Sequence, residues 1–333
     1  MNPVELSQLL KDLQPLSLGY LDTPLAHMPR LSQHLGGAEL WVKRDDLTGL
    51  ATGGNKVRKL NYVLADALRH DPDPIMTAGA QQSNQARQAA AAAAMLGIPC
   101  ALVLGGNEPV GPPQGNYLID RLVGAEVIWA GERSVADALQ EEALNLRRQG
   151  RNPYVIPFGA SNALGVCGYV QAMLEVMGQM ETRGLHFDAM LVASGSGGMQ
   201  AGLELGARLL GYRGCIIGIS IILRAPELQS VVANLANDAA ELLGVETRIA
   251  RDEIIVDDDF LGEGYGVVGE AEREALSLAA RFEGLLLDPV YTGRQMAGLI
   301  HGLRNGKFAA PQKVLFWHTG GVPAIFTKAS EII

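Results

Sequence analysis

Lys56 is the residue whose surroundings in this sequence most clearly favour chemistry. It follows Gly53, Gly54 and Asn55 and stands at the start of a predicted helix over residues 57–67. A helix N-terminus disfavours an ammonium ion, so it favours the neutral amine that a lysine needs to form a Schiff base with a carbonyl group. The glycines would let a ligand approach the backbone closely. The alternative is a surface lysine without a role, which is the usual interpretation of a single lysine.

The same stretch partly resembles a phosphate-binding P-loop. Four residues separate Gly49 from Gly54, but Asn55 then precedes the lysine. Val57 stands where a P-loop has the Ser or Thr that binds Mg²⁺. The missing hydroxyl disfavours a P-loop.

A second polar segment lies at residues 79–88, after a predicted strand and at the start of a predicted helix. Ser83 or Asn84 could simply cap this helix, because Ser and Asn are favoured at helix N-caps. The segment also gathers uncharged polar side chains at one strand end, which would suit a polar substrate: Gln81, Gln82, Ser83, Asn84 and Gln85.

A glycine-rich loop directly follows a predicted strand over residues 190–193. Successive backbone N–H groups and a helix N-terminus bind anions, so this loop predicts a phosphate site. A dinucleotide-binding loop is the rival interpretation, but the glycines do not match G-x-G-x-x-G. The loop consists of Ser194, Gly195, Ser196, Gly197, Gly198, Met199 and Gln200.

Three segments of the C-terminal part add further candidates. Tyr265 lies between two glycines, a pattern that is often only a turn. Residues 288–293 contain Tyr291 and Thr292, and residues 318–321 follow an apolar run. We assign His318 no acid–base role, because a single histidine after a strand is usually structural.

Short apolar runs alternate with helical patterns along the whole chain. Apolar strands between amphipathic helices predict βαβ units and parallel sheets. In such sheets ligands bind at the carboxyl ends of the strands, beside helix N-termini, which is where the candidate segments lie. The predicted strands cover residues 40–43, 75–78, 101–104, 127–129, 154–156, 190–193, 216–222 and 314–317, and the predicted helices include 57–67, 84–96 and 135–148.

Composition limits the classes of partner. The 333 residues predict two domains or one large α/β domain, and 48% are hydrophobic, enough for a buried core. A net charge of −9 without a basic run disfavours nucleic acid and anionic membranes. No secretory signal is visible, and Cys100, Cys167 and Cys215 match no metal spacing. We therefore expect no metal and no membrane span, with reduced thiols in the cytoplasm.

The order of the motifs resembles one enzyme family. Five motifs are similar, in type and in order, to the 1-aminocyclopropane-1-carboxylate deaminase / D-cysteine desulfhydrase family. They are Gly-Gly-Asn-Lys ending at residue 56, Gln-Ser-Asn-Gln at residues 82–85, the glycine loop, Asp-Pro-Val-Tyr at 288–291 and His-Thr-Gly-Gly at 318–321. The resemblance implies a fold-type II pyridoxal phosphate (PLP) enzyme. Its fold is α/β, with two open, twisted, mostly parallel sheets flanked by helices.

The resemblance also implies roles for individual residues. Lys56 would form the Schiff base with PLP and, once freed by substrate, would move the Cα proton. Asn84 would hydrogen-bond the ring oxygen of PLP, and Ser83 would hold the substrate carboxylate or assist proton transfer. The remaining roles are contacts to the phosphate by Ser194 to Gln200, to the pyridine nitrogen by Thr292, and to the substrate by Asn84, Gln85, Tyr265 and Tyr291.

Thr292 bears on which reaction this chain catalyses. Deaminases of the family that open the cyclopropane ring place a glutamate there, whereas the desulfhydrase branch places a threonine. A carboxylate beside the nitrogen stabilises the protonated ring, which is the stronger electron sink. Thr292 therefore favours β-elimination of a good leaving group over opening of an unactivated ring.

Three places depart from the family pattern. Phe158-Gly159-Ala160-Ser161 stands where the family often has a Gly-Gly-Ser ending, which implies a bulkier wall there. Met199 stands where the phosphate loop commonly has a threonine, so one hydroxyl contact to phosphate is lost. Gln85 replaces a histidine often seen in desulfhydrases and is more typical of the deaminases.

We therefore predict a PLP-dependent lyase that eliminates sulfide from a small amino acid, with D-cysteine the best candidate, giving pyruvate and ammonia. The alternatives are a cyclopropane-carboxylate deaminase, an L-cysteate sulfo-lyase, a PLP-binding protein without catalysis and, more distantly, a dinucleotide-dependent oxidoreductase. We expect a large PLP-binding domain from residues 1–56 and 166–333, a small domain from residues 57–165, and a homodimer.

Overall fold

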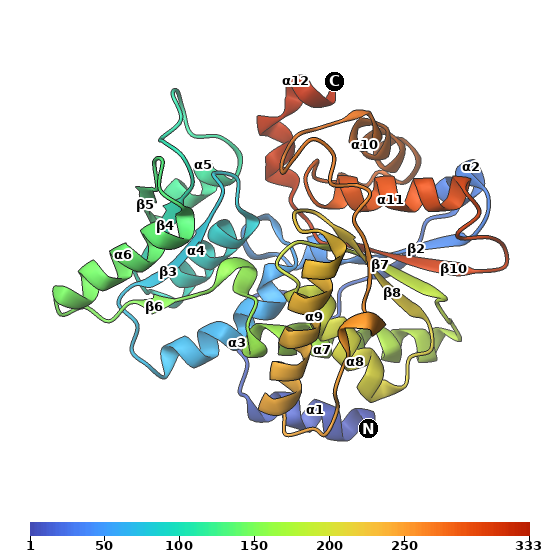
Figure 1. Cartoon of the computed structure of the whole chain (residues 1–333), viewed down its shortest axis with the longest axis horizontal. Coiled ribbons are helices and arrows are strands. Elements are labelled where there is room, and N and C mark those ends of the chain that lie inside the picture. The colour runs from blue at the N-terminus through green and yellow to red at the C-terminus, as the bar shows by residue number, and fades with distance from the viewer.

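The computed structural model describes all 333 residues and contains two separate sheets (Figure 1). The larger sheet has the order β1-β2-β10-β7-β8-β9 and the smaller one the order β5-β4-β3-β6. All neighbouring strands are parallel except β1 and β2. The strands are β1 (Leu25–His27), β2 (Glu39–Arg44), β3 (Ile75–Gly79), β4 (Cys100–Leu104), β5 (Glu126–Trp129), β6 (Tyr154–Val155), β7 (Ala189–Ser194), β8 (Cys215–Ser220), β9 (Ile255–Asp257) and β10 (Lys313–His318).

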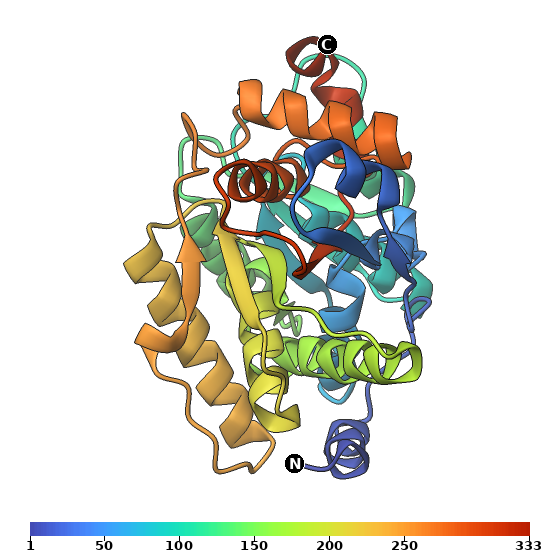
Figure 2. The same cartoon turned by 90° about the vertical axis from the view of Figure 1, so that its right-hand side faces the viewer.

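Twelve α-helices surround the sheets. In Figures 1 and 2, α10 and α11 cover one face of the larger sheet, and α7 and α8 cover the other. The helices are α1 (Pro3–Asp12), α2 (Pro29–Leu35), α3 (Lys56–Leu68), α4 (Asn84–Leu96), α5 (Gly115–Leu122), α6 (Val135–Arg148), α7 (Ala163–Arg183), α8 (Gly198–Leu210), α9 (Ala225–Leu242), α10 (Glu270–Glu283), α11 (Thr292–Arg304) and α12 (Ala329–Ile332).

The two faces of the larger sheet are built from alternating residues. In β7, Leu191 belongs to the core formed with α10 and α11, whereas Met190 and Val192 belong to the core formed with α7 and α8. Successive side chains of a strand point to opposite faces. Because both faces are buried, the strand has the continuous apolar sequence that predicts a parallel sheet.

The smaller sheet is packed between helices in the same way. Leu102 and Leu104 lie in one core with α3 and the alanine-rich α4, and Ala101 and Val103 lie in another with α6. The many alanines of α4 keep that helix close to its neighbours. Both sheets direct strand ends and helix N-termini toward the junction between them.

The predicted fold class is confirmed. All eight predicted strands are present within a few residues of their predicted limits. The prediction missed β1 and β9, three-residue strands at the edges of the larger sheet, which are too short to give a periodic pattern. None of the helices combines the length and the apolar character that a membrane crossing requires.

Candidate active site

A cavity of about 250 Å³ lies at the junction of the two sheets. It is bordered by the start of α3, the loop between β3 and α4, and the loop between β7 and α8. The structure thereby brings together most of the residues predicted from sequence: Lys56, Ser83, Asn84, Gln85, Ser194, Gly195, Ser196, Gly197, Met199, Tyr265 and Tyr291 line the cavity, while Gly198, Gln200 and Thr292 do not.

Lys56 is the first residue of α3. Burial and, secondly, the nearby charge of Arg87 lower the pKa of its amine from 10.5 to about 8. A lowered pKa makes the neutral amine accessible near neutral pH, as a lysine nucleophile requires. The direction is the one that the sequence predicts, and burial is its largest cause, while the charge of Asp288 opposes it.

The backbone before Lys56 is held in a fixed loop. Gly53 has φ 72°, and a Cβ there would lie 2.0 Å from the carbonyl oxygen of Asp46, so only glycine fits. The Asn55 amide donates to the Thr319 carbonyl at 3.1 Å, and the Lys56 amide donates to Gln88 Oε1 at 3.1 Å. The glycine-rich sequence thus positions a lysine.

Lys59 lies one helical turn beyond Lys56 and also lines the cavity. It is 1% exposed, and its Nζ donates to the Gly159 carbonyl at 3.0 Å and to Ser161 Oγ at 2.9 Å. No carboxylate contacts it. Burial and the charge of Lys56 hold the pKa of the Lys59 amine well below its usual value. Burial disfavours the ammonium form of Lys59 unless an anion lies beside it, so this geometry calls for an anionic ligand.

The loop after β7 completes an anion site around Lys59. A Cβ on Gly198 would lie 2.8 Å from Lys59 Nζ, so the amine sits against the N-terminus of α8. The Ser194 hydroxyl is buried without a partner, and Ser196 Oγ lies 2.8 Å from Ser161 Oγ. Helix N–H groups, hydroxyls and an ammonium are the groups that bind phosphate. The residues present therefore fit a phosphate ester.

The segment after β3 caps α4 and also borders the cavity. Ser83 caps α4, accepting a hydrogen bond from the Ala86 amide at 3.1 Å, and it also lines the cavity. Both amide atoms of Gln85 are buried without a partner. Buried polar atoms are nearly always hydrogen-bonded in folded proteins, so Gln85 has capacity left for a ligand.

Tyr265 and Tyr291 form a hydrogen-bonded pair in the lining of the cavity. Their hydroxyls are 2.7 Å apart and their rings meet edge to face at 6.1 Å between centroids. Burial raises the pKa of both phenols, of Tyr291 most strongly. Both therefore stay protonated at neutral pH. One hydroxyl donates to the other, so one proton remains free for a ligand.

Thr292 is fully buried and lies outside the lining of the cavity. Its hydroxyl donates to Asp288 Oδ1 at 2.7 Å and accepts from the Asp288 amide at 2.7 Å. Asp288 Oδ2 also accepts from the Tyr291 amide at 2.9 Å, which fixes the start of α11. The contact of Thr292 to the ring nitrogen stays a prediction.

Met199 is buried at the first turn of α8. Its sulfur accepts a weak hydrogen bond from Asn55 Nδ2 at 3.8 Å. The thioether therefore meets the residue before Lys56 and offers no hydroxyl to the anion site.

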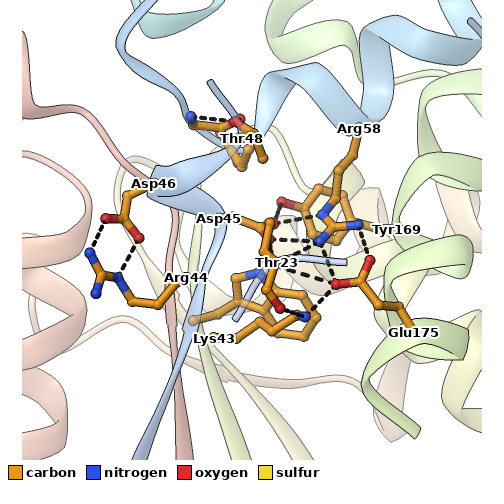
Figure 3. Close-up of polar contacts among 12 residues, drawn as sticks. Thr23, Lys43, Arg44, Asp45, Asp46, Thr48, Arg58, Tyr169 and Glu175 are labelled. Carbon is orange, nitrogen blue, oxygen red and sulfur yellow. Dashed lines mark hydrogen bonds and ion pairs between the residues drawn. The ribbon is translucent and has the colours of Figure 1, made fainter. Parts of the chain in front are cut away.

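A buried ionic cluster lies on the other side of α3 (Figure 3). Arg58 donates to Asp45 Oδ1 at 2.8 Å and to Glu175 Oε2 at 2.8 Å, and Lys43 pairs with Glu175. Tyr169 donates to Asp45 Oδ2 at 2.8 Å. Two cations and two anions thus satisfy one another and join β2, α3 and α7.

The sequence predicted no role in anion binding or positioning for three residues around the cavity: Lys59, Ser161 and Arg87. Lys59 shares a helix side with Lys56, because residues three apart are neighbours on a helix, and this spacing could have identified it. Ser161 contacts Lys59 and Arg87 contacts Gly53, and both partners are distant in sequence, so no local pattern predicts these contacts.

Known proteins are similar to this chain in sequence and in fold. The family model for pyridoxal-phosphate dependent enzymes matches residues 16–320. The chain belongs to that family. It is 44% identical over 317 residues to D-cysteine desulfhydrase from Yersinia enterocolitica, covering 93% of this chain and 94% of that protein. It is also 37% identical to an ACC deaminase homologue of known crystal structure, with a TM-score of 0.91 and 100% and 99% of the two chains covered.

More distant structures share the fold alone. The processed form of threonine deaminase isoform 2 from Solanum lycopersicum has a TM-score of 0.71 at 17% identity, with 100% of this chain and 88% of that chain covered. The chain is thus a fold-type II enzyme of the D-cysteine desulfhydrase / ACC deaminase group, and PLP is its cofactor.

Proposed function

We propose that this enzyme catalyses α,β-elimination from D-cysteine, giving pyruvate, ammonia and sulfide. The observation that carries the proposal is a cavity with a lysine of lowered pKa and two protonated phenols but no carboxylate. The 44% identity to a D-cysteine desulfhydrase supports the choice of substrate. With one water, the atoms of D-cysteine balance those of the three products.

In this proposal, Lys56 and Lys59 divide the binding of PLP. Lys56 would hold the aldehyde carbon, while Lys59, Ser194, Ser196 and the α8 N-terminus would hold the phosphate. When bound, PLP supplies a carbonyl for the substrate amine and a ring that withdraws electrons from Cα.

The residues of the chain move the protons. Lys56, when not bonded to the cofactor, would accept the Cα proton, because its lowered pKa leaves a neutral amine available. The free hydroxyl proton of the Tyr265–Tyr291 pair is donated to the departing sulfur. The hydroxyl of Ser83 and the amide of Gln85 bind the substrate carboxylate, for which Gln85 has unused hydrogen-bond capacity.

The charges of the cavity favour this substrate over the two alternatives in the same family. Lys56 and Lys59 are the only charged residues in its lining, and both are assigned to PLP. A second anionic group, such as the sulfonate of L-cysteate, would have no cation of its own. The lining itself contains no carboxylate that could hold a proton on the ring, so a good leaving group is favoured over cyclopropane opening. Thr292 remains our proposed neighbour of the ring nitrogen.

A substrate panel tests the proposal. The PLP-loaded enzyme is given D-cysteine, L-cysteine, L-cysteate, D-serine and the cyclopropane amino acid, and keto acid, sulfide and sulfite are measured. We expect pyruvate and sulfide in equal amounts, with the highest kcat/KM for D-cysteine. A higher kcat/KM for the release of 2-oxobutyrate or sulfite would show that the assignment of D-cysteine as substrate is wrong. No turnover of any compound would support a non-catalytic PLP carrier.

The domain division and assembly also stay proposals. A small domain of residues 57–165 contains the whole smaller sheet, which supports that division. We further propose a homodimer in the cytoplasm, and light scattering of the purified protein tests the dimer.

A further inference from the structure

Arg87 is a buried cation of α4 that the proposed reaction does not use. It has no exposed surface, and its Nη2 donates to the Gly53 carbonyl at 2.8 Å. Its Nη1 donates to Asn116 Oδ1 at 2.9 Å and, at 3.4 Å, to Asn84 Oδ1. Arg87 therefore contacts both the loop before Lys56 and the asparagine that lines the cavity.

Asn116, on α5, is equally buried and extends the same network. Its Nδ2 donates to the Gln82 carbonyl at 2.7 Å and to Asn84 Oδ1 at 3.0 Å. Its backbone amide donates to Gln82 Oε1 at 2.7 Å. The Asn84 oxygen thus accepts hydrogen bonds from two buried side chains.

Chemistry allows only one direction of hydrogen bonding in this network. A guanidinium has donors only, so Arg87 must meet the oxygen of Asn116. The nitrogen of Asn116 must then donate, and the Gln82 carbonyl, which can only accept, agrees with that direction. The same nitrogen requires the oxygen of Asn84 to face it. The Asn84 nitrogen, which makes no hydrogen bond within the chain, is left for the cavity.

We infer that Arg87 and Asn116 are positioning residues that orient the Asn84 amide so that its N–H group faces the ring oxygen of PLP. The inference rests on the proposed role of Asn84. With the amide reversed, its oxygen would face the ring oxygen, and two acceptors would repel each other. An asparagine alone does not determine which end faces a ligand. Here Arg87 does so chiefly through Asn116, whose contact to Asn84 Oδ1 is 3.0 Å, against 3.4 Å for Arg87 itself.

The same guanidinium fixes the other partner of the cofactor. Arg87 holds the Gly53 carbonyl, and its neighbour Gln88 accepts from the Lys56 amide and donates to the Leu50 carbonyl at 3.1 Å. One turn of α4 therefore sets the position of Lys56 relative to Asn84. The charge of Arg87 also contributes to the lowered pKa of Lys56.

The visible absorbance of the PLP-loaded enzyme, titrated with pH without substrate, is the test. It reports the proton on the nitrogen that joins Lys56 to PLP. A donor to the ring oxygen stabilises its negative charge and weakens its attraction for that proton. Loss of the donor in Asn84→Ala should raise the midpoint by about one pH unit, a tenfold change in proton affinity.

Asn116→Leu isolates the effect of orientation, because the charge of Arg87 stays in place. We expect its midpoint to rise in the same direction by at least half the Asn84→Ala shift, and the double variant Asn116→Leu/Asn84→Ala to equal Asn84→Ala alone. Arg87→Met, which removes charge and orientation together, should give the largest shift, and Arg87→Lys an intermediate one. Asn61→Leu is the matched control: Asn61 is a buried asparagine whose Oδ1 accepts from the Leu18 amide at 3.0 Å, away from the cavity.

The outcomes separate the possible failures. If Asn116→Leu and Asn61→Leu both leave the midpoint unchanged while Asn84→Ala moves it, the positioning role is wrong. Additive shifts in the double variant would also overturn it. An unchanged midpoint in Asn84→Ala would remove the inference together with the proposed role of Asn84. Circular dichroism checks folding, and Asn116→Leu decides alone if Arg87→Met does not fold. A wrong substrate assignment would leave all these titrations as they are.

Discussion

Arg58 and Lys59 are adjacent on α3, both are fully or almost fully buried, and they meet opposite surroundings. Arg58 contacts two carboxylates in a cluster where every charge has a partner (Figure 3). Lys59 contacts only a carbonyl and a hydroxyl and faces the cavity. Successive helix residues are rotated by about 100°, so one helix can serve both regions. Satisfied buried charges thus indicate structure, and unsatisfied ones indicate a ligand.

The largest effect should come from breaking the cluster. Arg58→Met leaves Asp45 and Glu175 buried without their shared cation, and we expect the free energy of unfolding to fall by about 3–5 kcal/mol. Denaturant unfolding of the PLP-free protein measures it. An unchanged midpoint would mean that the cluster contributes nothing, and the contrast with Lys59 would be lost.

Acid should weaken the same cluster. Burial opposes ionisation of Asp45, but the charge and hydrogen bonds of Arg58 outweigh it, so its pKa falls from 3.8 to about 2. The stabilisation is therefore complete above pH 3.8 and is lost as pH falls toward 2. It amounts to about 2 kcal/mol, because one unit of pKa shift corresponds to about 1.4 kcal/mol. Denaturant unfolding over this range should show a loss that Asp45→Asn lacks.

Lys59→Met should weaken the binding of PLP without destabilising the fold. Removing an unpaired buried cation leaves no partner stranded, so we expect the PLP-free protein to be as stable as before or more stable. The lost phosphate contact should weaken PLP binding by about 2 kcal/mol, or about 30-fold in Kd. Equilibrium titration with PLP measures this. Destabilisation as large as that of Arg58→Met, with unchanged affinity, would contradict the comparison.

Met199→Thr should give the smallest change. A hydroxyl at the first turn of α8 adds one donor toward the phosphate, and we expect PLP to bind about 5-fold more tightly, or about 1 kcal/mol. The same titration measures it, with Met199→Leu as the control that lacks a hydroxyl. Equal affinities of the two variants for PLP would show that a hydroxyl at position 199 does not contact the phosphate.

The sequence predicted the parts of the molecule that depend on local pattern. Continuous apolar runs identified the buried parallel strands, and polar or glycine-rich residues after β3 and β7 identified loops that do meet at the cavity. Lys56 was identified by the glycines before it.

Long-range partners could not be read in the same way. Arg58, Lys59 and Arg87 look alike in sequence, and their roles differ because Glu175, Ser161 and Asn116 lie 117, 102 and 29 residues away. Thr292 illustrates the same limit, because its hydroxyl engages Asp288 at the start of its own helix. Residue type predicts what a side chain can bind, and the fold decides what it meets.

The most direct test uses the two lysines of α3 that line the cavity. The PLP-loaded enzyme is reduced with borohydride, digested, and its peptides are sequenced by mass spectrometry. We expect the mass of reduced PLP on Lys56 alone, with Lys59 unmodified and the label absent from Lys56→Ala. Reduced PLP on Lys59, or on neither lysine, would contradict the central claim that Lys56 bonds the cofactor while Lys59 holds its phosphate.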